Sequence, residues 1–252
     1  MKLNVLKIGG AVVEDEAALG LFLKSFASME GAKLLVHGGG RTASNVCEKL
    51  GIKPMMSGGR RITDGDTLKV VTAVYAGLVN KNIVAKLQTE GVNAFGLCGA
   101  DFNVIRSVRR PVTDEGLDFG YVGDPVKVDN AVLTRLVKNG FVPVVSPITH
   151  DGNGQLLNTN ADTIASSVAG ALSSDFEVTL TYCFEKEGVL DADGRLVNEI
   201  DLARYETLKA DGTVSGGMIP KIDNAFSALR KGIRVVRITS ALSPEGGTLI
   251  RL

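Results

Sequence analysis

The sequence opens with a strand-and-glycine pattern that occurs twice within fifty residues. Residues 3–10 read LNVLKIGG, and residues 33–40 read KLLVHGGG. In each stretch a mostly apolar run, typical of a buried strand, ends at a glycine cluster. The segment after each cluster has apolar residues spaced three and four apart, which is the spacing of an amphipathic helix. Two strand–glycine–helix units in succession predict a parallel sheet with right-handed crossovers.

The same pattern continues to the end of the chain without a linker or a low-complexity stretch. We therefore expect one α/β domain over residues 1–252, built as a three-layer αβα sandwich around a central, mainly parallel sheet. Further strands are expected at 94–97, 142–145, 176–181 and 235–239, hairpins over 102–123 and at Asp151-Gly152, and helices over 68–87, after the caps Asp129 and Asn160, and over 220–231. The first two helices are expected to bury Leu19, Phe22, Leu23 and Phe26, and then Ala43, Val46, Cys47 and Leu50.

Composition excludes several classes of function. Lys plus Arg (28) equals Asp plus Glu (28), so the net charge does not favour nucleic acid or an anionic membrane as a partner. The three cysteines are isolated and there are only two histidines, which indicates reduced thiols and no zinc site. The start of the chain lacks the apolar segment of a signal peptide, and no apolar run is as long as a membrane span. A cytoplasmic protein is expected.

Glycine clusters at the carboxyl ends of parallel strands can bring bare N–H groups, backed by helix N-termini, close to an anion. Neither cluster has the spacing of a P-loop or of a dinucleotide fingerprint. Lys7 interrupts an apolar strand just before Gly9, and Lys221 lies in the first turn of a helix, where a cation is unfavourable unless an anion is near. Taken alone, Lys7 is better explained as an exposed residue at the end of a strand, and Lys221 equally well as solvated. Asp162 is explained as a helix-dipole partner.

Taken together, five blocks resemble the N-acetylglutamate kinase family, which has the amino acid kinase fold. The blocks are KIGG at 7–10, VHGGG at 36–40, GRRITD at 59–64, NTNADT at 158–163 and GGMIPK at 216–221. They are collinear and span nearly the whole chain. The resemblance implies ATP-dependent phosphorylation of the side-chain carboxylate of an N-acylglutamate in arginine biosynthesis.

The resemblance also implies roles for individual residues. Lys7 and Lys221 would flank the transferred phosphoryl group, and Asp162 would hold both lysines. The substrate would be bound by Gly39, Gly40, Arg61 and Asn158, with Gly39 also near the phosphates, and the phosphates and nucleotide by Gly9, Gly10, Gly38, Thr181, Tyr182 and Gly217. Mg²⁺ would arrive with ATP, so no protein metal cage is expected. Because a carboxylate is already a nucleophile, His37 is interpreted as a structural residue.

The lobes would divide the work: residues 1–175 would hold the acyl amino acid and the dimer contacts, and residues 176–252 the nucleotide. The helix from Leu68 is the candidate surface of a homodimer, with burial in its own core as the alternative. The family's nucleotide-side strand ends in Leu-[Thr/Ser]-Asp, whereas here Leu180-Thr181 is followed by the longer segment 182–187 without that aspartate. An aromatic residue there, Tyr182 or Phe184, could stack on a purine or belong to the core.

Two further questions stay open at this level. Arg106, Arg109 and Arg110 concentrate positive charge near the acyl pocket, so the acyl group could be acetyl or succinyl, with a solvated hairpin face as the plainer interpretation. The alternatives to an N-acylglutamate kinase are another enzyme of the same fold (an aspartate, glutamate, uridylate or carbamate kinase) and a nucleotide- or effector-binding module that lost its activity with the missing aspartate.

Overall fold

One central sheet runs through the whole molecule. The computed structural model describes residues 1–215 and 218–252. The sheet contains eight strands in the order β12-β14-β13-β11-β1-β2-β8-β5, and its pairings are parallel except that of β13 with β14. The predicted mainly parallel sheet is thus confirmed. Its strands are β1 (Lys2–Ile8), β2 (Ala32–His37), β5 (Ala94–Leu97), β8 (Val142–Val145), β11 (Glu177–Phe184), β12 (Glu199–Ile200), β13 (Val235–Ser240) and β14 (Thr248–Ile250).

Helices cover both faces of this sheet, as the predicted sandwich requires. One core packs α6, α7, α8 and α9 against the sheet, and a second core packs α2, α3 and the helical segment from α4 to α5 against its other face. The bounds are α1 (Gly10–Glu14), α2 (Glu16–Ser28), α3 (Gly40–Lys49), α4 (Gly65–Thr72), η1 (Ala73–Val79), α5 (Asn80–Thr89), α6 (Asn130–Lys138), α7 (Ala161–Leu172), α8 (Leu202–Ala210) and α9 (Met218–Leu229).

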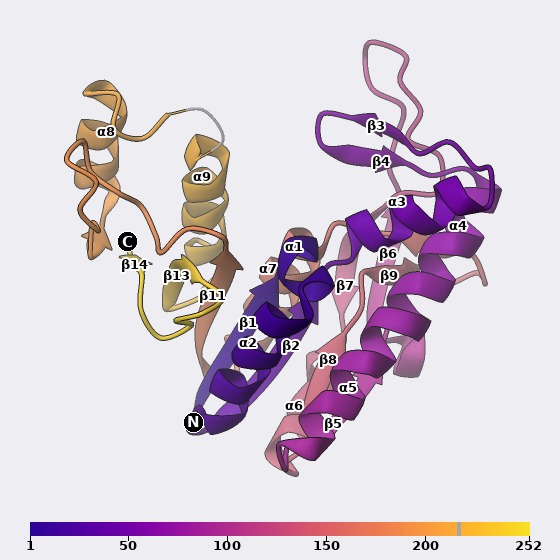
Figure 1. The fold of residues 1–252 in the computed structure, drawn as a ribbon, viewed down its shortest axis with the longest axis horizontal. Helices are drawn as coiled ribbons and strands as arrows, with labels where there is room; N and C mark the ends of the chain where they lie inside the picture. Colours follow the sequence, from indigo (N-terminus) through magenta and orange to yellow (C-terminus); the bar gives the residue numbers. More distant parts are fainter. Residues whose placement is uncertain (216–217) are drawn as a thin grey trace.

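Smaller strands form two accessory sheets beside the end of the main sheet that carries the glycine turns. A four-stranded sheet joins β6 (Ile105–Arg109), β7 (Gly123–Val128), β9 (Ile148–His150) and β10 (Leu156–Asn158), and a hairpin joins β3 (Met55–Ser57) to β4 (Arg60–Ile62). A short 3₁₀ turn, η2, covers Asp101–Asn103. In Figure 1 the β3–β4 hairpin and the long loop between β6 and β7 project together above α3 and α4.

The central sheet extends to both sides of β1. Figure 1 shows α8, α9, β13 and β14 on one side of β1 and the helices α3, α4 and α5 on the other. The parallel pairing of β1 with β11 lies near the middle of the sheet and runs from Lys2↔Glu177 to Ile8↔Cys183. This pairing places the end of β1 next to the end of β11, so groups from both lobes meet at one edge of the sheet.

Most predicted helix faces are confirmed, with one error. Leu19, Phe22, Leu23 and Phe26 are buried, but Leu50 is 64% exposed because it lies beyond the end of α3 and turns toward solvent at the cap. The expected helix from Leu68 is interrupted by the π-helical segment η1, a distortion that is common at functional sites.

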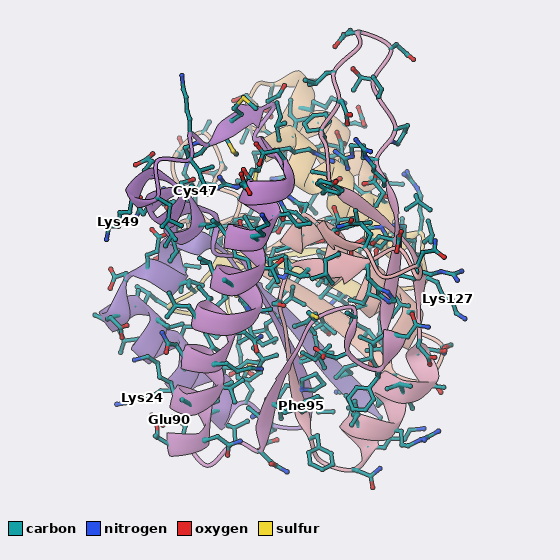
Figure 2. The ribbon with its side chains drawn as sticks, turned by 90° about the vertical axis from the view of Figure 1, so that its right-hand side faces the viewer. Lys24, Cys47, Lys49, Glu90, Phe95 and Lys127 are labelled. Atoms are coloured by element: carbon teal, nitrogen blue, oxygen red, sulfur yellow. The ribbon has the colours of Figure 1, made fainter. Side chains whose placement is uncertain are left out.

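Many charged residues lie on the outside of the molecule. In Figure 2 the side chains of Lys24, Lys49, Glu90 and Lys127 are at its periphery, and all four are exposed. Cys47, Cys98 and Cys183 are free thiols, of which Cys47 and Cys183 are buried. In the part of the chain that the structure describes, no helix is long and apolar enough to cross a bilayer.

Candidate active site

The two glycine turns predicted at the ends of β1 and β2 lie against each other. A Cβ atom on Gly38 would be 3.3 Å from the amide nitrogen of Gly10, and one on Gly10 would be 3.4 Å from that of Gly40. Glycine at these positions lets the two turns approach closely without crowding by a side chain. The Gly38 N–H group donates a hydrogen bond to the Ile8 carbonyl at 2.9 Å. This bond corrects the expectation that the Gly38 N–H is a phosphate donor, because it is already used by the backbone.

Lys7 extends from β1 to the helix that begins beyond Asn160. Its Nζ atom lies 2.8 Å from Oδ1 of Asp162, and its side chain is only 9% exposed. Asn160 caps α7 by accepting hydrogen bonds from the amides of Asp162 and Thr163. The cap fixes the first turn of α7, which in turn aims the Asp162 carboxylate at the lysine. A buried cation is stabilised by such a charged partner.

Lys221 approaches the same place from the other lobe. Its Nζ atom lies 3.9 Å from the centroid of the Phe184 ring, and that of Lys7 lies 5.7 Å from the same centroid. The two ammonium groups are therefore at most about 10 Å apart, the sum of these distances. Burial lowers the pKa of Lys221 and the Lys7 charge lowers it further, while Asp162 opposes both effects. Among the described residues Asp162 forms a salt bridge with Lys7 alone, although it was expected to hold both lysines.

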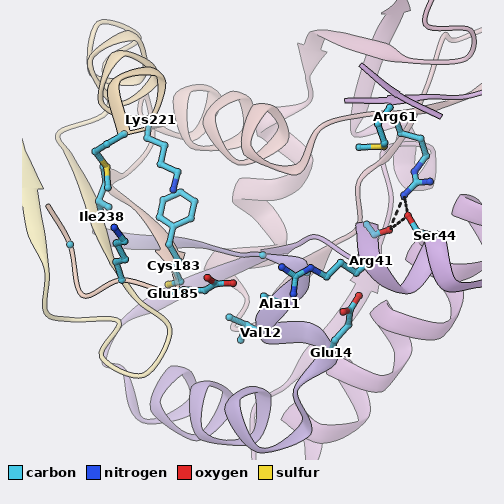
Figure 3. Close-up of a pocket in the computed structure, with 18 of the residues that line it drawn as sticks. Ala11, Val12, Glu14, Arg41, Ser44, Arg61, Cys183, Glu185, Lys221 and Ile238 are labelled. Carbon is cyan, nitrogen blue, oxygen red and sulfur yellow. Dashed lines mark hydrogen bonds between the residues drawn. The ribbon is translucent and has the colours of Figure 1, made fainter. Parts of the chain in front are cut away.

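A large cavity of about 890 Å³ lies beside Lys221. Figure 3 shows Lys221 extending into it from α9, with Glu185 and Cys183 at the end of β11 and Arg41 on the opposite side. The Gly9 and Gly10 turn and the Phe184 ring also line it. The size of the cavity and its mixture of backbone amides, cations and an aromatic face suit a nucleoside triphosphate.

A smaller cavity of about 210 Å³ adjoins the first one. The two share Gly10, Gly40, Met56 and Arg61 in their walls. Lys7, Asp162, Gly38 and Gly39 line the smaller cavity, and so does Asn158. A small acid bound in it would therefore have its reactive end next to the phosphates of a nucleotide in the larger cavity.

Arg61 is fixed at the boundary between the two cavities. Its Nη2 atom donates to the Gly40 carbonyl at 2.8 Å and to Ser44 Oγ at 2.7 Å, the two bonds drawn in Figure 3. Arg61 is 7% exposed, and its Nη1 atom is buried without a hydrogen-bond partner in the described structure. A buried, unpaired guanidinium nitrogen beside a cavity indicates a missing acceptor, and a carboxylate has the geometry to supply it.

Asn158 forms the opposite wall of the smaller cavity. Its Nδ2 atom donates a hydrogen bond to Thr63 Oγ1 at 2.9 Å, and Thr63 forms an isolated parallel β-bridge with Gly120. The amide side chain is 8% exposed. One donor of the amide is used by Thr63, so its second N–H and its oxygen remain for an amide group of a ligand.

Two of the expected nucleotide contacts, Thr181 and Tyr182, are not found in the cavity walls. Thr181 and Tyr182 are 2% and 4% exposed and do not line either cavity; burial raises the pKa of Tyr182 well above its usual range. Tyr182 therefore belongs to the core, and Phe184, two residues further along β11, reaches the larger cavity instead. Gly217 lies outside the described residues.

The three arginines expected near the acyl group separate in the structure. Arg109 pairs at the surface with Asp118, and Arg106 is exposed on β6. Arg110 alone of the three lines the smaller cavity, where it forms an ion pair with Asp124. Arg60, which the sequence analysis did not single out, lines the cavity too; its position beside Arg61 in GRRITD was the available signal.

His37 has the structural role expected for it. It is fully buried, its Nδ1 atom lies 2.8 Å from the Gly38 carbonyl, and its Nε2 atom lies 3.1 Å from Nδ2 of Asn80. The amide N–H of Asn80 must donate, so Nε2 accepts and Nδ1 carries the proton. Burial is the main cause that lowers the pKa of His37 to about 4, so the ring is neutral near pH 7 and braces the glycine turn.

Residues 2–240 match the model of the amino acid kinase family. The chain belongs to this family. Within it, the chain is similar to acetylglutamate kinases: it is 54% identical to that of Bacteroides fragilis strain ATCC 25285 over 99% of this chain and 97% of the relative, and 56% identical to that of Bacteroides thetaiotaomicron over 99% and 98%. The resemblance found in the five sequence blocks is thereby confirmed.

Solved structures agree on the fold. The protein smu.665 from Streptococcus mutans superimposes with a TM-score of 0.80 at 27% identity, covering 99% of this chain and 98% of that one. An N-acetylglutamate synthase from Neisseria gonorrhoeae, solved with coenzyme A and N-acetyl-glutamate, gives a TM-score of 0.83 at 23% identity over 99% of this chain and 59% of its own. The second similarity concerns the fold alone.

Proposed function

We propose that this protein transfers the terminal phosphoryl group of ATP to the side-chain carboxylate of an N-acyl-L-glutamate, as its acetylglutamate kinase relatives are named for doing, in arginine biosynthesis. The observation that carries the proposal is that Lys7, in the wall of the smaller cavity, and Lys221, in the wall of the adjoining larger one, lie near the same Phe184 ring. The larger cavity would hold ATP and the smaller one the acyl amino acid.

The charges at the junction fit phosphoryl transfer. Such a reaction needs in-line positioning and stabilisation of negative charge on the transferred group, with little covalent help. Lys7 and Lys221 would supply cations from both sides, and the amides of the Gly9–Gly10 turn would supply hydrogen-bond donors. The acceptor carboxylate is ionised at neutral pH, so the site needs no general base.

Arg61 and Asn158 would orient the acceptor. The unpaired Nη1 of Arg61 would bind the α-carboxylate, and Asn158 the N-acyl amide. Holding these two groups would leave the side-chain carboxylate directed toward the cavity junction. Asp162 acts on the reaction through Lys7, whose ammonium group it holds at 2.8 Å.

Mg²⁺ is the metal that such a reaction implies, and it neutralises part of the phosphate charge when bound. Among residues 1–215 and 218–252 there is no group of three or more His, Cys, Asp or Glu that could hold a metal ion. A Mg²⁺ ion that arrives with ATP would be held mainly by phosphate oxygens. Lys7 and Lys221 would neutralise the remaining phosphate charge.

The acyl group has a second candidate. Arg60 and Arg110 line the smaller cavity, while Asp124 is the ionic partner of Arg110 alone. Burial, followed by the charge of Arg110, lowers the pKa of Arg60. One positive charge at this end of the cavity would be matched by the extra carboxylate of N-succinylglutamate, which N-acetylglutamate lacks.

An ADP-release assay tests the proposal. We expect ADP to form with ATP, Mg²⁺ and N-acetylglutamate or N-succinylglutamate, and not with aspartate, glutamate, uridylate or carbamate. The absence of release above the ATP-only background with both N-acyl substrates would overturn the kinase assignment. Comparison of kcat/KM for the two then identifies the acyl group: preference for succinyl that is lost in Arg60→Ala would assign the second carboxylate to Arg60.

A further inference from the structure

The lysine from the C-terminal lobe rests on an aromatic ring instead of a carboxylate. Nζ of Lys221 lies 3.9 Å from the centroid of Phe184, close enough for a strong attraction between the ammonium and the negative face of the ring. Nζ of Lys7 is 5.7 Å from the same centroid, also within the range of such an interaction. Phe184 thus contacts both cations that the proposed reaction uses.

The sheet register explains how one ring reaches both lysines. Lys7 lies opposite Tyr182 in the pairing of β1 with β11, and side chains two residues apart on a strand share a face. Phe184 is therefore one step beyond Tyr182 on the face where Lys7 lies. The two rings stack with centroids 6.2 Å apart, and Tyr182 is buried, so the Phe184 ring is supported from below.

The charges around Lys221 indicate a role for the Phe184 ring. Two ammonium groups in one partly buried site repel each other, and Asp162 is committed to Lys7 at 2.8 Å. Burial is the main cause that lowers the pKa of Lys221. The charges of Lys7 and Lys186 lower it further, whereas those of Asp162 and Glu185 raise it. A carboxylate beside Lys221 would hold it firmly and compete with phosphate for it, whereas an aromatic face attracts the cation without using any of its three hydrogen-bond donors.

We propose that Phe184 is a positioning residue, which holds the ammonium group of Lys221 opposite Lys7 through a cation–π interaction until the phosphates of ATP arrive. This inference rests on the proposed kinase function for its catalytic consequence. The placement of the lysine itself does not depend on that function.

Fluorination of the ring tests the interaction without changing its shape. Phe184 is replaced by 4-fluoro-, 3,5-difluoro- and 3,4,5-trifluorophenylalanine, which weaken the negative face stepwise. We expect kcat to fall in the same order, by between about twofold and about thirtyfold in total. The alkaline limb of the kcat–pH profile should also move to lower pH, because the charged form of Lys221 loses stabilisation. Trifluorophenylalanine at Phe95, whose ring faces Phe141 and is elsewhere in the fold, is the matched control.

A spectroscopic measurement separates this inference from the kinase assignment. In the substrate-free protein, the ε-methylene protons of Lys221 should show an upfield ring-current shift, assigned by its loss in Lys221→Arg and abolished in Phe184→Leu. An active enzyme whose kcat is unchanged across the fluorinated series, or a wild-type protein without that shift, would overturn the role of Phe184. A protein that shows the shift but no activity on N-acylglutamates would support the placement of Lys221 and overturn only the kinase function.

Discussion

Lys7 and Asp162 form a salt bridge of 2.8 Å in which the lysine is almost buried and the aspartate is partly exposed. The pair joins the end of β1 to the start of α7, so it connects the first glycine turn to the wall of the smaller cavity. Because the cation has little access to water, the ion pair with Asp162 is an important part of its electrostatic stabilisation.

Replacement of Asp162 by Asn should weaken both stability and turnover. The Lys7 ammonium would lose its charged partner while it stays buried, which costs about 1–3 kcal/mol. Urea unfolding of Asp162→Asn measures that loss, and steady-state kinetics measure the fall in kcat. Asp66→Asn is the matched control, because Asp66 pairs with Lys69 on the surface with both side chains at least 71% exposed. The control should change the free energy of unfolding by less than about 0.5 kcal/mol, and an equal loss in both variants would contradict the role of the pair.

Removal of either lysine at the junction should reduce turnover strongly. For Lys7→Ala and Lys221→Ala we expect kcat to fall by about a hundredfold or more, as loss of a group that stabilises transition-state charge does in other enzymes. Lys186→Ala, which removes another cation from the wall of the larger cavity, should have a much smaller effect. Near-normal turnover in either of the first two variants removes that lysine from the mechanism.

Arg61→Lys should affect the acyl amino acid and spare ATP. A lysine cannot reproduce the forked geometry that lets Arg61 bind Gly40 and Ser44 with one nitrogen and present the other to a carboxylate. We expect kcat/KM for N-acetylglutamate to fall about tenfold to a hundredfold, with a smaller change in KM for ATP. Arg41→Lys, in the larger cavity alone, is the control. The prediction is wrong if KM for ATP rises more than KM for the acyl amino acid.

Stability should fall in mild acid because of His37. The pKa of His37 is lowered in the folded protein from 6.5 to about 4, so between these values the unfolded chain binds more protons. The stability contributed by the neutral ring is complete above pH 6.5 and is lost as pH falls toward 4, by about 2 kcal/mol at pH 5. Asn at this position keeps a donor for Gly38 and does not titrate. Urea titrations at pH 7 and pH 5 should therefore show a smaller loss in His37→Asn, and an undiminished loss would assign the acid sensitivity to other groups.

Gly120→Ala should disturb the wall that holds Asn158. Gly120 has φ +70°, and an added Cβ would lie 2.2 Å from the Thr63 carbonyl oxygen, so the backbone must move. We expect a loss of about 2–4 kcal/mol and a raised KM for the acyl amino acid. Gly116→Ala is the control. Gly116 has φ +82° and open space around it, so this substitution tests backbone strain without a steric clash. Thermal unfolding should place Gly116→Ala between the wild type and Gly120→Ala; equal midpoints for the two variants would show that the contact with Thr63 is unimportant.

The sequence predicted the architecture because its signals are local. The strand–glycine–helix units at 3–10 and 33–40 became β1, β2 and their turns, and the end of the chain that carries Lys221 folded into the predicted helix. The cap Asn160 and the hairpin at Asp151-Gly152 were also found where expected. These features depend on neighbouring residues, which is why reading along the chain recovers them.

What the sequence could not predict depends on contacts between distant segments. β11 was expected to end at Thr181, but its pairing with β13 continues to Phe184↔Ser240, and the extra residues carry Phe184 into the site while Tyr182 stays buried. Arg109 and Arg110 are neighbours in the chain, yet their partners Asp118 and Asp124 direct them to the surface and to the cavity. Such choices are set by burial and partner position, which periodicity does not encode.

Lys7 is paired with Tyr182 in the central sheet, so the position of the Lys7 side chain depends on correct folding of the sheet. The distance that a phosphoryl group must cross depends on the register in which β1 and β11 are hydrogen-bonded. A register shift of one residue would turn Lys7 to the opposite face of the sheet. Substitutions that weaken the pairing of β1 with β11 should therefore lower both kcat and thermal stability.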